Sequence, residues 1–305
     1  MSLGILLALV SAVVWGSGDF VGGAATRRSH QFQVLALSAL SGIVLLTLLA
    51  WLFETVPSRA NAAWAAAAGL AGAIGIASLY HGLAVGGAAM VAPVAAVVTA
   101  AIPAVYTAFA VAPPSAWQLA GFLAAVAGIW LVTRQAEVGP AEAGHYVHSR
   151  TPEDSWTPPT LQTPKTPGLS RLHRGVRQAL AAGIGFGTFL ILIAQVDRTL
   201  VFGPLVVART VMLAMGLVLM IVRGISFPGL TSNPLALVAG ALDAGGNIFF
   251  VLARQHTRLD VAAVLSSLYP VATVVLARII WREPVAPQQW AGGGMCLLAV
   301  ALMAE

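Results

Sequence analysis

The chain has 305 residues, of which 58% are hydrophobic and only 9% are charged, whereas soluble proteins carry about a quarter charged residues. With a mean hydropathy of +0.86, it has too little polar surface to coat a water-soluble globule, so we expect an all-α integral membrane protein. The net charge of +5 does not indicate nucleic-acid binding, because the basic residues lie mostly between apolar runs. The single cysteine, Cys296, excludes an internal disulfide and a multi-cysteine metal site.

Apolar runs of membrane-spanning length predict ten transmembrane helices. The first run is too long for the apolar core of a signal peptide, so we expect it to be the first span of the mature protein. The fifth and tenth runs are the shortest. In chain order the predicted helices are Leu3–Ala25, Phe32–Phe53, Trp64–Leu83, Ala88–Val111, Trp117–Val132, Val176–Val196, Val201–Val222, Leu235–Leu252, Val261–Trp281 and Trp290–Ala304.

The segment between the fifth and sixth predicted helices has a different composition. Residues 134–174 are rich in proline, contain several threonines and mixed charges, and lack apolar periodicity. This composition predicts a flexible linker between two five-helix domains, residues 1–133 and 175–305. His145 and His148 lie in it as candidate metal ligands, but a solvated linker is the better interpretation. We therefore expect no metal site and no cofactor.

The second half of the chain repeats the first at an offset of 171 residues. Matches of glycine, proline and glutamine are the informative ones, because aliphatic matches mean little in so apolar a chain. Since each copy holds five predicted helices, an odd number, the second copy must enter the bilayer upside down relative to the first. Inverted repeats of this kind are typical of secondary transporters. The matched pairs are Gly16 and Gly187, Gly69 and Gly240, Gly75 and Gly246, Gly121 and Gly292, Pro113 and Pro284, and Gln118 and Gln289.

Three charged side chains lie inside predicted spans, where an unpaired charge costs at least roughly 2.5–3.5 kcal/mol. Asp19 follows Trp15 by about one turn, so the two share a helix face. Arg209 and Asp243 have similar predicted depths, and we expect them to face each other or a shared water-filled cavity. Asn247 lies one turn beyond Asp243. The pair either fixes helix register alone or takes part in transport.

Two interpretations also stay open for Asp19. It either lines the cavity, which we favour, or pairs near the end of its helix with Arg27 or Arg28.

Prolines inside two predicted helices indicate distorted segments. Pro93 and Pro103 lie in the fourth helix, and Pro270 lies next to Tyr269 in the ninth. Proline removes a helical hydrogen bond and tends to kink the helix. Because the fourth and ninth helices correspond in the repeat, these positions are candidate kink and gating sites beside a binding region.

Together with the predicted spans and the repeat, several short motifs make the chain resemble the EamA family of the drug/metabolite transporter (DMT) superfamily. The resemblance rests on Trp15-Gly16, Leu79-Tyr80, Val91-Ala92-Pro93-Val94, Leu268-Tyr269-Pro270-Val271, Glu283-Pro284, Gln289, Gly292 and Arg209. The halves also depart from each other: Thr99, Ala112 and Ser38 stand in the first half where the second has Pro270, Glu283 and Arg209. Roles therefore cannot be mirrored between the halves.

The resemblance implies a carrier of a small organic metabolite such as an amino acid, commonly an exporter. It also implies a bacterial-type inner membrane and a central cavity between the halves. The expected mechanism is alternating access, with protons as the candidate coupling ion. The candidate substrate contacts are Trp15, Asp19, Tyr80, Arg209, Asp243, Asn247 and Tyr269.

Other function classes are weighed against this one. The chain carries no phosphate-cradling loop, paired-histidine zinc helix or nucleophile elbow, so neither an enzyme nor an ATP-driven pump is expected. A permease or flippase for sugars or lipid-linked molecules, and a non-transporting membrane scaffold, stay open as alternatives. The sequence leaves the substrate, the transport direction, the orientation of the termini and the oligomeric state undetermined.

Overall fold

The computed structural model describes residues 2–26, 28–54, 56–86, 88–133, 169–281 and 285–303. These residues fold into eleven α-helices and one π-helical turn, Ala277–Trp281, with no strand among them. The helices are α1 (Leu3–Thr26), α2 (Gln31–Phe53), α3 (Arg59–Gly86), α4 (Ala88–Ala110), α5 (Ala116–Thr133), α6 (Leu169–Ile193), α7 (Phe202–Val222), α8 (Pro234–His256), α9 (Leu259–Ser266), α10 (Tyr269–Leu276) and α11 (Pro287–Met303).

Seven helical stretches of the described residues are long and apolar enough to cross a membrane. Two further apolar helices, Val94–Ala110 and Ala116–Val132, are shorter. An all-helical, multi-pass membrane architecture is therefore confirmed. The full set of ten crossings stays a prediction.

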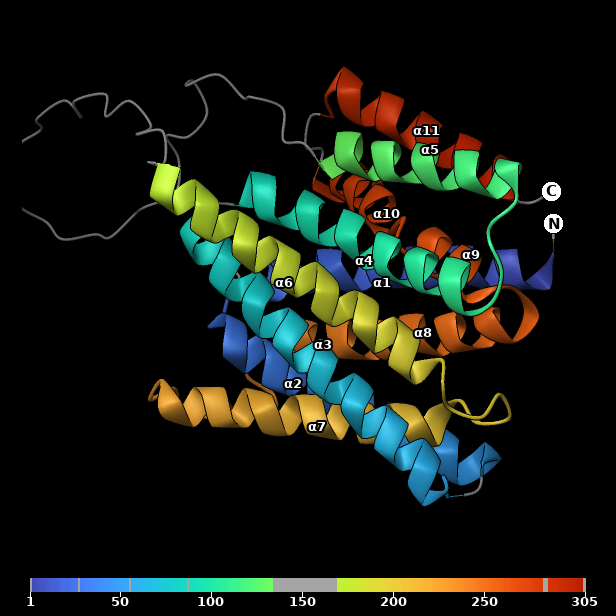
Figure 1. Ribbon diagram of the computed structural model, residues 1–305. Coiled ribbons are helices and arrows are strands. Elements are labelled where there is room, and N and C mark those ends of the chain that lie inside the picture. The colour runs from blue at the N-terminus through green and yellow to red at the C-terminus, as the bar shows by residue number, and fades with distance from the viewer. Residues whose placement is uncertain are drawn as a thin grey trace, which may run out of the picture.

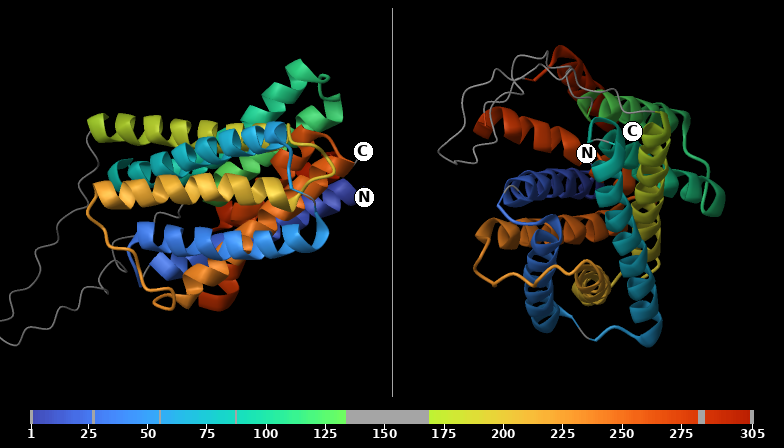
Figure 2. Two further views of the ribbon diagram at one scale, coloured as in Figure 1. Left: turned by 90° about the horizontal axis from the view of Figure 1, so that it is seen from below. Right: turned by 90° about the vertical axis from the view of Figure 1, so that its left-hand side faces the viewer.

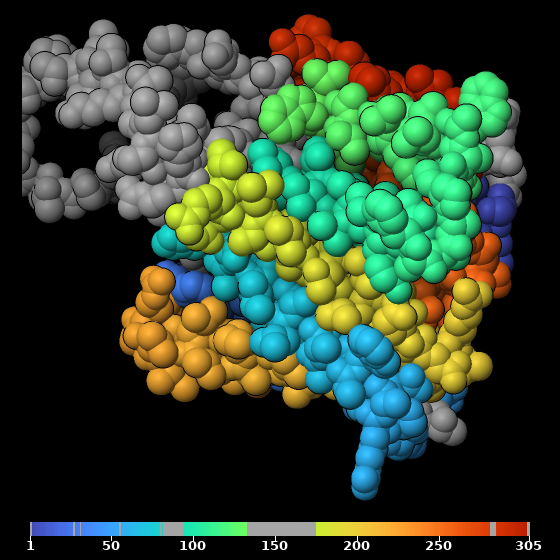
Figure 3. Space-filling view, viewed as in Figure 1, coloured from blue at the N-terminus to red at the C-terminus, as the bar shows by residue number. Residues whose placement is uncertain are grey.

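The helices cross one another at an angle, and successive helices alternate in sense except that α10 continues in the sense of α9 (Figure 1). α1 begins and α11 ends at the same end of the bundle, which we call the terminal end (Figures 1 and 2). The two halves of the chain interdigitate, because α1 packs on α8, α3 on α6 and α5 on α11. Figure 3 shows α3, α6 and α4 side by side on one face. The predicted linker, residues 134–174, lies outside the described residues up to 168, and α6 already begins at Leu169.

Close helix contacts recur in the two halves with the same offset. A side chain on Gly246 of α8 would collide with the indole of Trp15 on α1. In a second contact between the halves, a Cβ on Gly75 of α3 would lie 2.8 Å from the ring of Phe186 on α6. Gly75 corresponds to Gly246 in the repeat, and Trp15 corresponds to Phe186. The same contact is therefore made twice, with the roles of the two halves exchanged. The missing side chains let the backbones approach, which supplies packing energy in lipid.

A second pair of contacts follows the same rule. A Cβ on Gly16 would lie 2.5 Å from the carbonyl oxygen of Tyr269 and 3.1 Å from the amide nitrogen of Thr273, so α1 packs tightly on α10. A Cβ on Gly187 of α6 would lie 2.6 Å from the Cβ of Ile102 on α4. Ile102 and Thr273 are again repeat partners. The glycine matches found in the sequence are thus the crossing points of the helices.

The matched glutamines have a local reason. Ser115 donates its N–H to Oε1 of Gln118 at 3.1 Å, and Gln118 donates its N–H to the Ser115 hydroxyl at 3.2 Å. Gln289 likewise accepts the N–H of Ala286 at 2.9 Å. Each glutamine reaches back to the residue before its own helix, the capping arrangement that satisfies otherwise unpaired amides at a helix start. Both copies therefore need glutamine at the beginning of their last helix.

The predicted ninth helix is not one helix. α9 ends at Ser266, α10 begins at Tyr269, and α10 continues into the π-helical turn. Pro270 explains the break, because its ring cannot donate an N–H and would clash with the carbonyl four residues earlier, that of Ser266. In the first half the corresponding α4 is continuous through Pro103. The interruption therefore occurs in only one of the two matched helices.

Candidate functional site

Polar side chains from four helices come together where α1 packs on α8 and α10. We call Asp19 of α1, Arg209 of α7, Asp243 and Asn247 of α8, and Tyr269 of α10 the central polar cluster. α1 packs on both α8 and α10, and this packing brings residues from opposite ends of the sequence together. All five are among the candidate contacts predicted from the sequence.

Arg209 and Asp243 form an ion pair through Nη2 and Oδ2. The predicted contact between them is confirmed. Their exposure differs, since the Arg209 side chain is 8% exposed and that of Asp243 is 48% exposed. Arg209 is wedged where α2 meets α8: a Cβ on Gly42 would lie 3.0 Å from its Nη1 and 3.2 Å from the carbonyl oxygen of Gly240. The guanidinium is therefore fixed by the scaffold, while the carboxylate faces solvent.

Asp19 is exposed, although its neighbours on α1, Gly18 and Phe20, are buried. Within the described residues Asp19 has no hydrogen-bond or ion-pair partner, and it is close enough to Asp243 for their charges to interact. Arg28 does not pair with Asp19, and Arg27 lies outside the described residues, so the cavity position of Asp19 stays a prediction.

Two aromatic residues border the same region. Tyr269 is half-buried and close enough to Asp19 for an electrostatic interaction. Its hydroxyl has no hydrogen bond to any described residue. Trp15, one turn before Asp19, stacks on Phe250 with ring centroids 6.1 Å apart and an interplanar angle of 26°. The site thus combines unpartnered polar groups with an aromatic wall.

Asn247 has a structural explanation of its own. It is 7% exposed, and its amide donates to the backbone carbonyl of Asp243 at 2.7 Å, one turn earlier in α8. This bond orients Asn247 within its helix. Of the remaining sequence candidates, the side chains of Tyr80 and Pro93 lie outside those that the structure describes.

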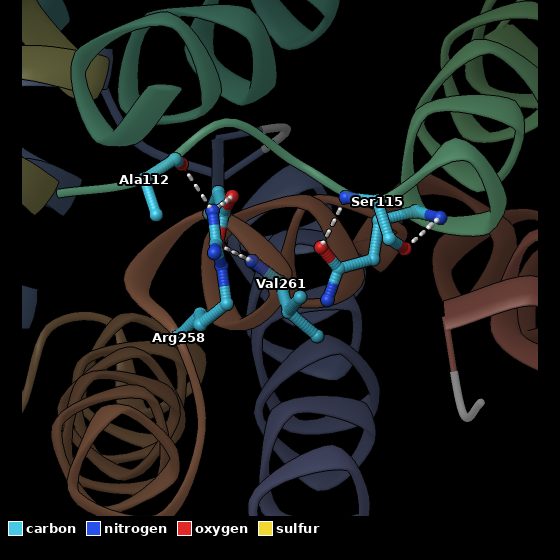
Figure 4. Close-up of polar contacts among 6 residues, drawn as sticks. Ala112, Ser115, Arg258 and Val261 are labelled. Carbon is cyan, nitrogen blue, oxygen red and sulfur yellow. Dashed lines mark hydrogen bonds and ion pairs between the residues drawn. The ribbon is translucent and has the colours of Figure 1, made fainter. Parts of the chain in front are cut away.

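The terminal end of the bundle is joined by a charged contact that sequence reasoning missed. Arg258, before α9, donates to the carbonyl oxygen of Ala112 at 2.8 Å and to the carboxylate of Asp260 at 3.1 and 2.9 Å (Figure 4). Asp260 is fully buried and also accepts the N–H of Val261. The hydrogen bond to Asp260 raises the pKa of Arg258 above its ordinary value. We call this contact the Arg258 clamp; it fastens the α8–α9 turn to the α4–α5 loop.

Two further side chains fasten the same end. Glu54, after α2, accepts the N–H groups of Val201, Phe202 and Gly203 at 2.5, 2.9 and 2.8 Å, so its carboxylate caps the start of α7. Arg254 of α8 donates at 2.8 Å to two carbonyls, those of Ala194 and Val196, at the end of α6. Both residues lie at predicted helix ends, where solvation was the simpler expectation. No local signal reveals partners 147 and 60 residues away.

A hollow lies between α2, α3 and α7, away from the central polar cluster. It is lined by carbon-rich side chains and a glycine, without a charged or hydroxyl-bearing residue. It offers no group that would orient a polar solute, so the central polar cluster is the better candidate site. Among the described residues no three metal-ligating side chains come together.

The arrangement can be compared with known proteins. The model of the EamA-like transporter family matches residues 2–134 and 173–304. The chain belongs to this family. The predicted resemblance is thereby confirmed, and the protein is a membrane transporter of the DMT type. No curated protein matches the chain. One crystal structure of a protein superposes on this EamA-like transporter with a TM-score of 0.71, at 16% identity over 98% of this chain and 96% of the other, a likeness that shows the fold alone.

Proposed function

We propose that this EamA-like transporter moves a small organic metabolite across a bacterial-type inner membrane, as an exporter working by alternating access. In this proposal each half crosses the bilayer five times, and the second half is an inverted copy of the first. Support comes from the contacts made twice with the halves exchanged, at Gly75 and Gly246 and at Gly16 and Gly187. The residues 1–133 and 175–305 are the proposed domains.

The observation that carries the proposal is Asp19. Asp19 lies within a membrane-length helix and has no partner among the described residues; an ionised carboxylate in such a place is expensive, and such residues mark substrate or ion pathways. Solvent reaches Asp19 and Asp243, whereas Asp260–Ser266 of α9 are buried throughout. This difference fits a site that is closed toward the terminal end. Helix crossings at glycine, where the two helices approach closely, are the proposed points about which the halves would rock.

Asp19 is the proposed proton carrier if transport is coupled to protons. The charged and titratable groups that face Asp19 are Asp243 from α8, Arg209 from α7, which is paired with Asp243, and Tyr269 from α10. The broken helix before Pro270 is the proposed gating element on the same path.

Counterflow in vesicles tests the function. Purified protein is reconstituted, and uptake of labelled amines, amino acids and sugars is measured against an internal excess of the same unlabelled solute. We expect at least one solute to exchange with the wild-type protein. Asp243→Asn should lose exchange while assembling normally, and Asp197→Asn in the α6–α7 loop is the matched control.

Three results would contradict the proposed site or the proposed function. Retained exchange in Asp243→Asn would remove the cluster from the pathway. Lipid scrambling by the same vesicles, without exchange of any soluble solute, would identify a flippase instead. Absence of both activities in well-folded protein would favour a scaffold.

A further inference from the structure

The charges of the central polar cluster do not cancel. Two carboxylates, Asp19 and Asp243, face one guanidinium, that of Arg209, which leaves one net negative charge when both acids are ionised. Arg209 is already engaged by Asp243 and no described residue pairs with Asp19, so the uncompensated charge lies on Asp19. A charge without a partner in the protein favours any ligand of opposite sign that can reach it.

We propose that this site selects solutes that carry one positively charged amine, whose ammonium group pairs with Asp19. The inference rests on the proposed transport function and names its substrate class. It differs from an amino-acid site, which would have to satisfy a carboxylate as well as an amine.

The geometry around Arg209 argues against a carboxylate in the solute. Its side chain is 8% exposed, it is held by Asp243, and it is hemmed in by Gly42 and Gly240. A solute carboxylate would have to displace Asp243, leaving two protein carboxylates with no cation between them. Among the described residues of the cluster no other cation is available. A carboxylic acid without an amine would meet only the repulsion of Asp19.

The rest of the solute has suitable surroundings. The Tyr269 hydroxyl is free to bond a polar group near the ammonium. Trp15, on the face of Asp19 and stacked on Phe250, provides an aromatic surface for a hydrocarbon portion and for the cation itself. A monoamine with an apolar body therefore fits Asp19, Tyr269 and Trp15 together.

A series of three compounds of similar shape tests how the charge of the solute affects its binding. 2-Phenylethylamine, phenylalanine and 3-phenylpropionate share one ring and chain and carry net charges of about +1, 0 and −1 near neutral pH. Binding to the purified full-length protein is measured by calorimetry at fixed ionic strength and pH. We expect the amine to bind about tenfold or more tightly than the other two.

Variants test whether Asp19 is the residue that makes the protein prefer the amine. Asp19→Asn should weaken amine binding about tenfold or more, Asp19→Glu should keep the order of the three compounds, and the control Asp197→Asn should bind like wild type. The comparison of compounds on wild-type protein needs no variant, so misfolding of Asp19→Asn cannot conceal the answer. Tighter or equal binding of phenylalanine or phenylpropionate would overturn the proposal. So would failure of the amine to bind, or unchanged amine affinity in folded Asp19→Asn.

Counterflow separates this inference from the transport function. Amine binding that requires Asp19 without exchange of any solute would support the site and refute transport. Exchange of a zwitterion or an acid, with no amine binding, would refute the amine site and leave transport standing.

Discussion

The close approach of α1 to α10 can be tested with one methyl group. Gly16→Ala would place a Cβ 2.5 Å from the carbonyl oxygen of Tyr269 and 2.6 Å from the Cβ of Ala272. Ordinary contact needs about 3.5 Å, so one helix must move by roughly 1 Å. Overpacking of this kind costs about 1–3 kcal/mol. It also displaces Tyr269, a member of the central polar cluster, so solute exchange should fall together with stability.

The matched control lies on the same helix. Gly23→Ala adds the same methyl group where nothing lies within 4 Å, so it should be neutral, or stabilising by up to about 1 kcal/mol because alanine is the better helix former. The free energy of unfolding of both variants is measured by denaturant titration in one detergent, and exchange is measured in vesicles. Equal stability of Gly16→Ala and Gly23→Ala would refute the inferred packing of α1 on α10.

Three further predictions follow from polar contacts. Arg258→Gln leaves the buried carboxylate of Asp260 without its cation, so unfolding in detergent should become easier by about 3–5 kcal/mol; Asp260→Asn on the Arg258→Gln background should recover part of the loss, and no loss at all would contradict the clamp. Glu54→Gln should cost about 0.5–2 kcal/mol, because the cap of α7 loses its charge; high salt should shrink the difference, and a salt-independent loss would argue against a charge effect. A double-mutant cycle of Arg209→Gln and Asp243→Asn should show a coupling of about 0.5–3 kcal/mol in stability; a coupling in stability without any in exchange would assign the pair to helix register alone.

Sequence reasoning succeeded where a single helix or a repeated residue carries the information. Apolar runs identified the helices, and the repeat offset identified Gly16, Gly75, Gly187 and Gly246 before their contacts were visible. The pairing of Arg209 with Asp243 was predictable because a charge in lipid needs a partner at its own depth.

The polar contacts between distant chain segments were not predictable in this way. Glu54 caps a helix that begins almost 150 residues later in the chain, and Arg258 bonds a loop carbonyl 146 residues before it. Both looked like ordinary flanking charges, because loop geometry decides such bonds and a hydropathy pattern contains no information on it. The effect of a proline on its helix was not predictable either. α4 is continuous through Pro103, whereas the predicted ninth helix is divided into α9 and α10 at Pro270.

The Arg258 clamp has no equivalent in the first half of the sequence. Gly87 and Ala89 stand at the positions that correspond to Arg258 and Asp260, and neither residue can form an ion pair. Moving the α8–α9 turn away from the α4–α5 loop would break the hydrogen bond from the charged guanidinium of Arg258 to the Ala112 carbonyl, while the ion pair with Asp260 stays within its own turn. The equivalent movement at the opposite end would break no hydrogen bond from a charged side chain at these positions. The two ends of the transporter are therefore fastened unequally, and the terminal end carries the stronger fastening.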